Sequence, residues 1–170
     1  MESEILFQIT VGEGELVFYH PSHDFHDRGD GRGSSKSAGR SPVNYNDNSV
    51  VFKLLFRNST ILFPGDIMKN VESMLSRNHA HELKSDILIA PHHGSATSST
   101  DIFIDTVNPG AVIISCGWKN RFGFPNEEVV DRYRQKGIDI YRTDIHGAVT
   151  LYSDGNGWNI VTFRPHVNHY

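Results

Sequence analysis

The sequence predicts an α/β fold in which layers of helix and sheet enclose one core. From Asp66 onward, short apolar runs that suit buried strands alternate with amphipathic stretches that suit helices. Before Asp66, and again near the C-terminal end, the apolar runs come in pairs, which predicts hairpins on either side of the alternating part. Functional residues in such folds gather on the loops at the strand ends, so chemistry is expected there.

The first part of the chain contains two predicted strand pairs. These are residues 5–10 with 15–19, and residues 49–56 with 60–63. Gly12 and Gly14 suit a tight reversal in the first pair, and the second pair ends at Asp66 after a Pro-Gly. Between the pairs, the segment at about 27–41 is rich in Gly, Ser and Arg and has nothing to bury. It is predicted to be a flexible loop, although its cations leave open a phosphate-binding arm.

Helices and strands alternate in the remainder. The predicted helices are 68–78, 98–107 and 126–137, and the predicted strands are 86–90, 111–115, 138–141, 148–152 and 159–163. Ser98 with Asp101 makes a capping-box-like start for the second helix. Asn126 caps the third helix, which ends at Gly137. Residues 1–170 are therefore expected to form a single domain.

The composition excludes several classes of protein. Cys116 is the only cysteine among 170 residues, so neither a disulfide framework nor a cysteine-based zinc knot can form within the chain. The formal net charge of -4 argues against a broad basic surface for nucleic acid or anionic lipid, although a local basic patch stays open. No apolar run approaches the ~20 residues of a membrane span, and the start of the chain lacks the positive charge of a secretory signal. A cytoplasmic or otherwise soluble location is the default expectation.

Two predicted strand ends carry residue types that bind metals. Asp66 follows one strand, and His92 with His93 follows the next. Carboxylate oxygen and imidazole nitrogen are the ordinary ligands of catalytic zinc or manganese, which activate water as a nucleophile at neutral pH. A Gly-Asp pair is also common in turns and helix caps, and a His pair can be structural. The residues by themselves therefore leave both interpretations open.

The loop after a later strand carries cations beside aromatic rings. Lys119 and Arg121 are expected on the same side of the sheet as the His pair, where they could clamp a phosphate. The alternative is a loop held in place by packing of Trp118 and Phe122. Cys116, at the end of the preceding strand, is expected to be an inert core residue.

Several linked motifs resemble those of a known family. They are Asn46-Asp47-Asn48-Ser49-Val50-Val51, Ile61-Leu62-Phe63-Pro64-Gly65-Asp66, Leu83-Lys84-Ser85-Asp86-Ile87-Leu88-Ile89-Ala90-Pro91-His92-His93-Gly94-Ser95, Val107-Asn108-Pro109, Ile113-Ile114-Ser115, Asn120-Arg121-Phe122-Gly123, and Tyr141-Arg142-Thr143-Asp144 before Gly147-Ala148-Val149. In order and spacing, over about residues 14–155, they are similar to the metallo-β-lactamase-fold domain of ComEC-type competence proteins and their soluble relatives. The resemblance implies an αββα sandwich, of which this chain would supply the C-terminal half as a partial domain.

The resemblance also implies a metal-dependent hydrolase, which in the competence proteins is thought to act as a nuclease on the phosphodiester backbone of DNA. Asp66 would be the carboxylate shared by two divalent metals, and one of His92 or His93 would bind the second metal. Ser95 would place a hydroxyl donor beside them. Metal-activated water would attack phosphorus while the metals neutralise charge on the phosphate oxygens. Asp47 would support the loop rather than bind metal.

Two departures from the family pattern bear on activity. The superfamily's His-x-His-x-Asp-His metal motif has no match in this chain, and Phe124-Pro125 lacks the nearby histidine that relatives usually carry. The matched motifs offer roughly two ligands, whereas a catalytic zinc normally takes three. A partner such as an N-terminal half-domain, the cluster from His20 to Asp27, or residues missing from this chain could complete the site. Otherwise the chain is a degenerate, non-catalytic binding module.

The remaining polar residues have simpler interpretations. The family pattern makes Asp144 structural or close to the site, and His146 is expected to be a solvated turn residue. His166 and His169 belong to a tail that is expected to fray. A nucleic-acid binder that works without metal through the loop from Arg28 to Arg40 is a third interpretation.

A lone half-domain has a consequence for solubility. It exposes the apolar sheet face that the other half would cover, so self-association is expected.

Overall fold

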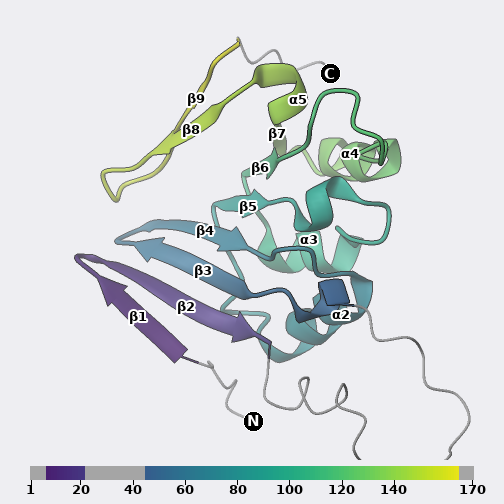
Figure 1. The fold of residues 1–170 in the computed structure, drawn as a ribbon. Helices are drawn as coiled ribbons and strands as arrows, with labels where there is room; N and C mark the ends of the chain where they lie inside the picture. The colour runs from purple at the N-terminus through teal and green to yellow at the C-terminus, as the bar shows by residue number, and fades with distance from the viewer. Residues whose placement is uncertain (1–6, 22–44, 165–170) are drawn as a thin grey trace, which may run out of the picture.

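A mixed sheet forms the centre of the molecule in the computed structural model, which describes residues 7–21 and 45–164 (Figure 1). Its strands lie in sequence order: β1 (Phe7–Val11), β2 (Gly14–His20), β3 (Val51–Phe56), β4 (Ser59–Phe63), β5 (Ile87–Ile89), β6 (Ala111–Ile114) and β7 (Asp139–Arg142). Strands β1 to β4 pair antiparallel, and β4 to β7 pair parallel. The predicted loop at about 27–41, the cluster after His20, and His166 and His169 lie outside the described residues.

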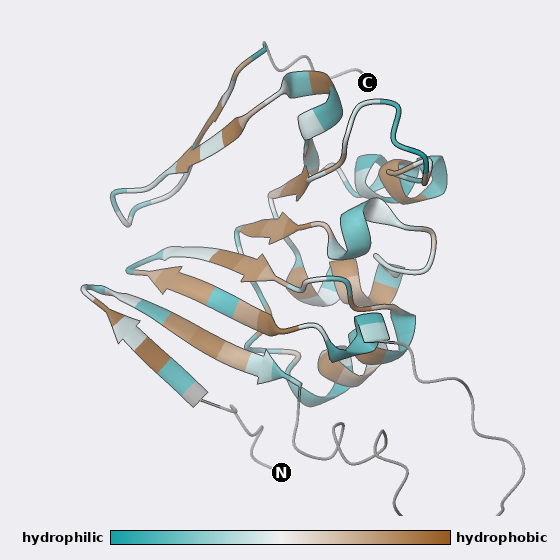
Figure 2. Cartoon of the chain, viewed as in Figure 1, coloured by the Kyte–Doolittle hydropathy of each residue, from teal (hydrophilic) through white to brown (hydrophobic). Residues whose placement is uncertain are grey.

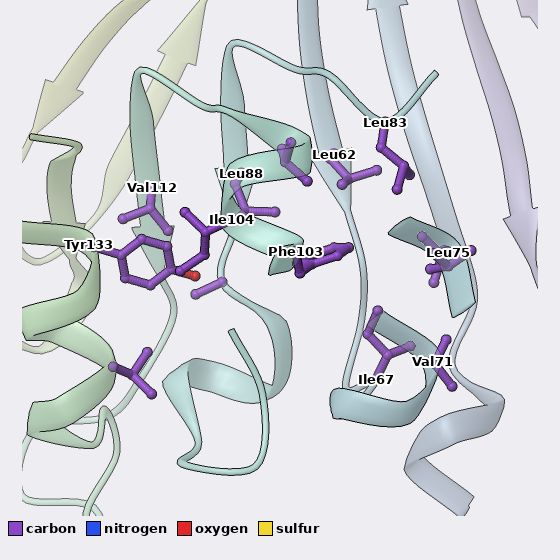
Figure 3. Packing of buried hydrophobic residues seen from close by; sticks show 14 of the residues in the cluster. Leu62, Ile67, Val71, Leu75, Leu83, Leu88, Phe103, Ile104, Val112 and Tyr133 are labelled. Atoms are coloured by element: carbon purple, nitrogen blue, oxygen red, sulfur yellow. The ribbon is translucent and has the colours of Figure 1, made fainter. Parts of the chain in front are cut away.

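Three helices cover one face of this sheet (Figure 1). They are α2 (Lys69–Asn78), α3 (Asp101–Val107) and α4 (Glu127–Gln135). Because side chains alternate along a strand, residues in register across neighbouring strands share a face, and Leu62, Leu88 and Val112 form such a row beneath the helices. Phe103 and Tyr133 reach this row from the helices (Figure 3). The α/β class predicted from the sequence is confirmed, and the αββα sandwich stays a prediction.

A short hairpin lies on the other face of the sheet. It consists of β8 (Val149–Tyr152) and β9 (Asn159–Thr162), and it follows the single turn of α5 (Thr143–His146). Ile61, Ile87 and Ile113 point to this side and pack with the hairpin. Figure 2 shows that hydrophobic residues dominate the inner strands, while the loop between β6 and α4 is largely hydrophilic.

Two N-terminal helix caps were predicted from the sequence, and the structure confirms one of them. Asn126 caps α4 as predicted, since its Oδ1 accepts a hydrogen bond from the Glu128 N–H at 3.0 Å. The predicted Ser98 start is wrong, because Thr100 is the cap of α3. The Ser98 hydroxyl lies 2.9 Å from the Pro91 carbonyl and 3.0 Å from the Ser95 carbonyl, so it holds the loop before α3 instead. Ser98 and Thr100 are both good capping types, so the local pattern alone did not separate them.

The parallel strands bring their following loops to one edge of the sheet. Strands β4, β5 and β6 are adjacent and parallel, so the segments after them leave from the same side. Asp66 follows β4, the short helix η2 (Pro91–Gly94) follows β5, and the segment from Cys116 follows β6. Another short helix, η1 (Tyr45–Asn48), precedes β3. Among the helices of the described residues, none has the length and apolar character needed to cross a membrane.

Candidate functional site

Asp66 and His93 meet at this edge of the sheet. The Nε2 atom of His93 lies 3.5 Å from Oδ1 of Asp66. Both side chains are about half exposed, at 50% for His93 and 42% for Asp66. The Asp66 backbone N–H donates to Ser49 Oγ at 3.0 Å, which fixes the start of the loop after β4. The two residues follow the ends of neighbouring parallel strands, β4 and β5, on strand-end loops as the sequence predicted.

A hydrogen bond determines which nitrogen of His93 faces the carboxylate. Nδ1 lies 2.8 Å from the backbone carbonyl oxygen of Ser115, at the end of β6. Since a carbonyl oxygen only accepts hydrogen bonds, Nδ1 carries the proton. In neutral His93, Nε2 therefore turns a lone pair toward the oxygen of Asp66, and a proton or a metal cation between the two atoms would relieve their repulsion.

The distance between these two donor atoms suits a shared metal ion. Ligands held about 2.0–2.2 Å from one tetrahedral zinc ion lie roughly 3.3–3.6 Å apart, and the observed separation of Nε2 and Oδ1 is 3.5 Å. The residues therefore fit two positions of a metal site. Among the described residues, no group of three or more His, Cys, Asp or Glu side chains is arranged to hold a metal ion.

His92 is adjacent in sequence but lies in a different environment. Its Nε2 accepts from the Asn46 side-chain amide at 3.2 Å, and its Nδ1 lies 3.4 Å from Thr97 Oγ1. Both ring nitrogens are thus occupied within the protein, away from Asp66. The sequence left open which histidine faces the carboxylate, and the structure brings His93 to it.

The turn that carries the two histidines has an unusual backbone. His92 and His93 both adopt left-handed conformations, with φ of 48° and 57°. Such values cost of order 1–3 kcal/mol for a non-glycine residue, and they persist where the surroundings over-determine them. Here the His92 N–H donates to the Gly65 carbonyl at 3.0 Å, and the Asn126 N–H donates to the Gly94 carbonyl at 2.9 Å. A Cβ at Gly94 would lie 2.7 Å from Cβ of Pro125, so only glycine fits there.

Asp47 and Ser95 hold loops in place. Asp47 is buried, and its Oδ1 accepts from the Met68 N–H at 2.9 Å, which supports the loop-fixing role predicted for it. Its backbone carbonyl contacts Nε2 of the buried His20 at 2.7 Å. Ser95 is also buried, and its Oγ lies 3.0 Å from Thr97 Oγ1. Ser95 Oγ is thus occupied by a local hydrogen bond.

The loop after β6 is not held in place by its aromatic rings, which was one of the two interpretations of its sequence. Trp118 is 71% exposed and Phe122 is 63% exposed, so packing of these two rings does not hold the loop. Lys119 Nζ lies 4.4 Å from the centre of the Trp118 ring, and Arg121 Cζ lies 4.8 Å from that of Phe122. The sequence reasoning missed Phe124, whose ring contacts both His92 and His93.

The residues behind this loop form a polar cluster. Arg142 binds Asp144 through two nitrogens at 3.1 and 2.8 Å. Burial would raise the pKa of Asp144, but hydrogen bonds from Arg142 and the Cys116 thiol outweigh it and lower that pKa. Burial, together with the bond to Asp144, raises the pKa of Cys116 to about 11, in keeping with an inert thiol. His146 is buried and its Nδ1 accepts from the Arg142 N–H at 2.9 Å, so the prediction of a solvated turn residue is wrong.

The chain is similar to segments of much longer bacterial proteins. It is 34% identical to competence protein ComA of Neisseria gonorrhoeae over 110 residues, which cover 65% of this chain and 16% of that protein. It is 31% identical to ComE operon protein 3 of Bacillus subtilis over 64% of this chain and 14% of that protein. The uncharacterized protein YcaI of Escherichia coli is 30% identical over 72% of this chain and 16% of its own length. No family model matches the chain. The chain thus spans about a sixth of the length of these relatives, one of which is named as a competence protein.

Proposed function

We propose that this chain forms part of a metal-dependent hydrolase of the metallo-β-lactamase type, which cleaves phosphodiesters in nucleic acid in a role linked to competence. The observation that carries the proposal is the approach of His93 Nε2 to Asp66 Oδ1, at 3.5 Å and with the lone pair of neutral His93 toward the carboxylate. The similarity to a protein named for competence supports nucleic acid as the substrate class. ComEC-type proteins are the family that the motifs resemble.

In this mechanism Asp66 and His93 would hold a divalent cation, zinc or manganese. When bound, that cation would lower the pKa of a coordinated water and neutralise charge on the phosphate. The Ser115 carbonyl keeps the proton on Nδ1 of His93 and so keeps Nε2 free to bind. The bond from the Asp66 N–H to Ser49 fixes the loop that carries the carboxylate. These contacts set the two donors in place before a cation arrives, which reduces the cost of binding it.

Lys119 and Arg121 would contribute to substrate binding in the same proposal. Both are exposed and lie on the loop that follows β6, next to the strand end that bears the histidine turn. Their charges suit phosphate oxygens, and Arg121 offers the planar fork that binds them bidentately.

The number of donors favours a second candidate function. Asp66 and His93 supply two ligands, and a catalytic zinc normally takes three. The remaining ligands would come from outside the described residues or from another polypeptide, such as an N-terminal half-domain. Without them, the chain would be a non-catalytic binding module.

The adjacent histidines provide a matched pair of variants to test the site. We expect His93→Asn to abolish retention of zinc or manganese and His92→Asn to reduce it far less, because only the His93 ring reaches Asp66. Asparagine tolerates the left-handed backbone at both positions, so the turn is preserved. The measurement is metal stoichiometry by elemental analysis after loading the 170-residue chain and removing excess metal, with Asp66→Asn alongside.

Phosphodiesterase activity is then measured on the same proteins. Activity that requires the added metal and is lost in Asp66→Asn and His93→Asn would support the hydrolase. Equal metal retention by the two histidine variants would contradict the assignment of His93. Wild-type chain that retains no metal would favour the binding module.

A further inference from the structure

The segment Gly117–Phe124, here called the aromatic loop, presents rings and cations together to solvent. Trp118 is 71% exposed and Phe122 is 63% exposed. Each ring has a neighbouring cation over it, Lys119 over Trp118 and Arg121 over Phe122. The two cations thus lie close together on one exposed loop, in a chain whose formal net charge is -4.

The aromatic loop is held by polar contacts, and the rings of Trp118 and Phe122 stay largely exposed. The side chain of Asn120 donates to the carbonyls of Gly117 and Phe124 at 2.9 and 2.6 Å. Its Oδ1 accepts from the backbone N–H groups of Phe122 and Phe124 at 3.2 and 3.0 Å. The Asn120 side chain thus sets the shape of the loop. Trp118 and Phe122 are exposed in a loop whose backbone is held in place.

The rings form a row that leads to the candidate metal site. Phe122 stacks on Phe124 with ring centres 5.6 Å apart and an interplanar angle of 19°. Phe124 in turn stacks on His93 at 6.4 Å and 25°. His93 reaches Asp66 through Nε2. The row therefore runs from solvent to the two donors of the site.

We propose that the aromatic loop binds single-stranded nucleic acid, with bases stacked on Trp118 and Phe122 and phosphates paired with Lys119 and Arg121. Its placement beside the cleavage site rests on the proposed function, whereas the binding itself needs no metal. Bases in a duplex are already stacked on one another, so exposed rings select a strand whose bases are free. Stacking tolerates any base, because every base has a π face. The loop is therefore expected to bind single strands without sequence preference.

Binding is tested by fluorescence anisotropy with a labelled oligothymidylate about 15 nucleotides long, in the presence of EDTA. We expect Trp118→Ala and Phe122→Ala each to weaken binding by about tenfold, and the double variant to weaken it by about a hundredfold. Tyr152→Ala is the matched control, because Tyr152 is a ring that is 59% exposed on β8. All of these side chains are exposed, so the core is untouched, and circular dichroism checks the fold.

Three further arms complete the test. A duplex of the same length is expected to bind more weakly than the single strand, and an oligouridylate arm tells whether the strand is DNA or RNA. Lys119→Gln and Arg121→Gln are each expected to reduce the salt dependence of binding by about one phosphate contact. Because binding is measured in EDTA, a failure of the metal site leaves this result intact. The proposal is overturned if the ring variants bind like wild type, if the duplex binds as tightly, or if Tyr152→Ala loses as much.

Discussion

The two faces of the central sheet are built from the same strands but are closed very differently. The face beneath α2, α3 and α4 is closed by packed side chains (Figure 3). Its buried core residues are each at most 6% exposed. The other face carries Phe18, Phe52 and Phe63, whose rings form a row with centres 5.5 and 4.7 Å apart. These three rings are only partly buried. The hairpin β8–β9 covers the neighbouring strands of this face.

The difference shows that strand alternation alone does not decide whether a face is closed. Lys53 and Leu55 point to the helix side of β3, while Phe52 and Leu54 point to the other side, so both sides carry large apolar side chains. The two faces differ in the segments of the chain that pack on them. Helical connections between parallel strands pack on the helix face, whereas within residues 7–21 and 45–164 a short hairpin alone packs on the other face.

A pair of Phe→Ala variants measures this difference directly. We expect Phe103→Ala to lower the free energy of unfolding by about 3–5 kcal/mol, because Phe103 is fully buried among the helices. Phe52→Ala should cost only about 1–2 kcal/mol, because its ring already meets solvent. Urea denaturation followed by circular dichroism gives both values. Equal losses would show that the second face is as closed as the first.

A buried carboxylate adds a polar element to the helix face. Glu72 on α2 is fully buried, and its two oxygens accept from the Ser99 and Thr100 N–H groups at 2.5 and 2.9 Å. It thereby joins α2 to the start of α3. We expect Glu72→Ala to lower the free energy of unfolding by about 2–3 kcal/mol, because it leaves both N–H groups without their acceptor. Thermal and urea unfolding measure the loss, and Glu128→Ala, which removes an exposed helix carboxylate, should cost less.

The same carboxylate makes stability depend on pH. Burial raises the pKa of Glu72 above its ordinary value of 4.5, although the two N–H donors and Arg132 oppose that shift. The folded protein then holds this proton more tightly than the unfolded chain does. The contribution of Glu72 is therefore fully present below pH 4.5 and declines as pH rises through the folded pKa. We expect urea titrations to show this decline for wild type relative to Glu72→Gln, and parallel pH profiles would contradict it.

The smallest expected effect is self-association of the protein through the sheet face that carries Phe18, Phe52 and Phe63. Its row of partly buried rings predicts weak, concentration-dependent self-association, as expected for an uncovered apolar sheet face. Sedimentation velocity over a concentration series should detect it, and Phe18→Ser with Phe52→Ser should suppress it. Ile102→Ser is the control, because Ile102 is 64% exposed on α3, on the helix side. A monomer at all concentrations would count against an open face.

Much of the fold followed from local sequence patterns. The strand pairs, the three main helices and the Asn126 cap were predicted, because periodicity and capping residues act within a few positions of one another. The start of α3 at Thr100 was missed because Ser98 and Thr100 are both good capping residues, and the Ser98 hydroxyl instead bonds carbonyls of the loop just before α3. The burial of His146 was missed because the predicted turn is a short helical turn, α5, in which the Arg142 N–H donates to His146 Nδ1.

The candidate site also has some features that local sequence patterns predict and others that they do not. The positions of Asp66, His92 and His93 after two successive predicted strands could be read from the sequence, because strand ends and residue types are local properties. Which histidine faces Asp66 could not, since that choice depends on the Ser115 carbonyl, on Asn46 and on two left-handed residues in succession. The exposure of Trp118 and Phe122 was left open by the sequence, and it accompanies the short-range hydrogen bonds by which Asn120 holds their loop. The choice between the two histidines instead depends on contacts between segments far apart in the sequence, which no local pattern encodes.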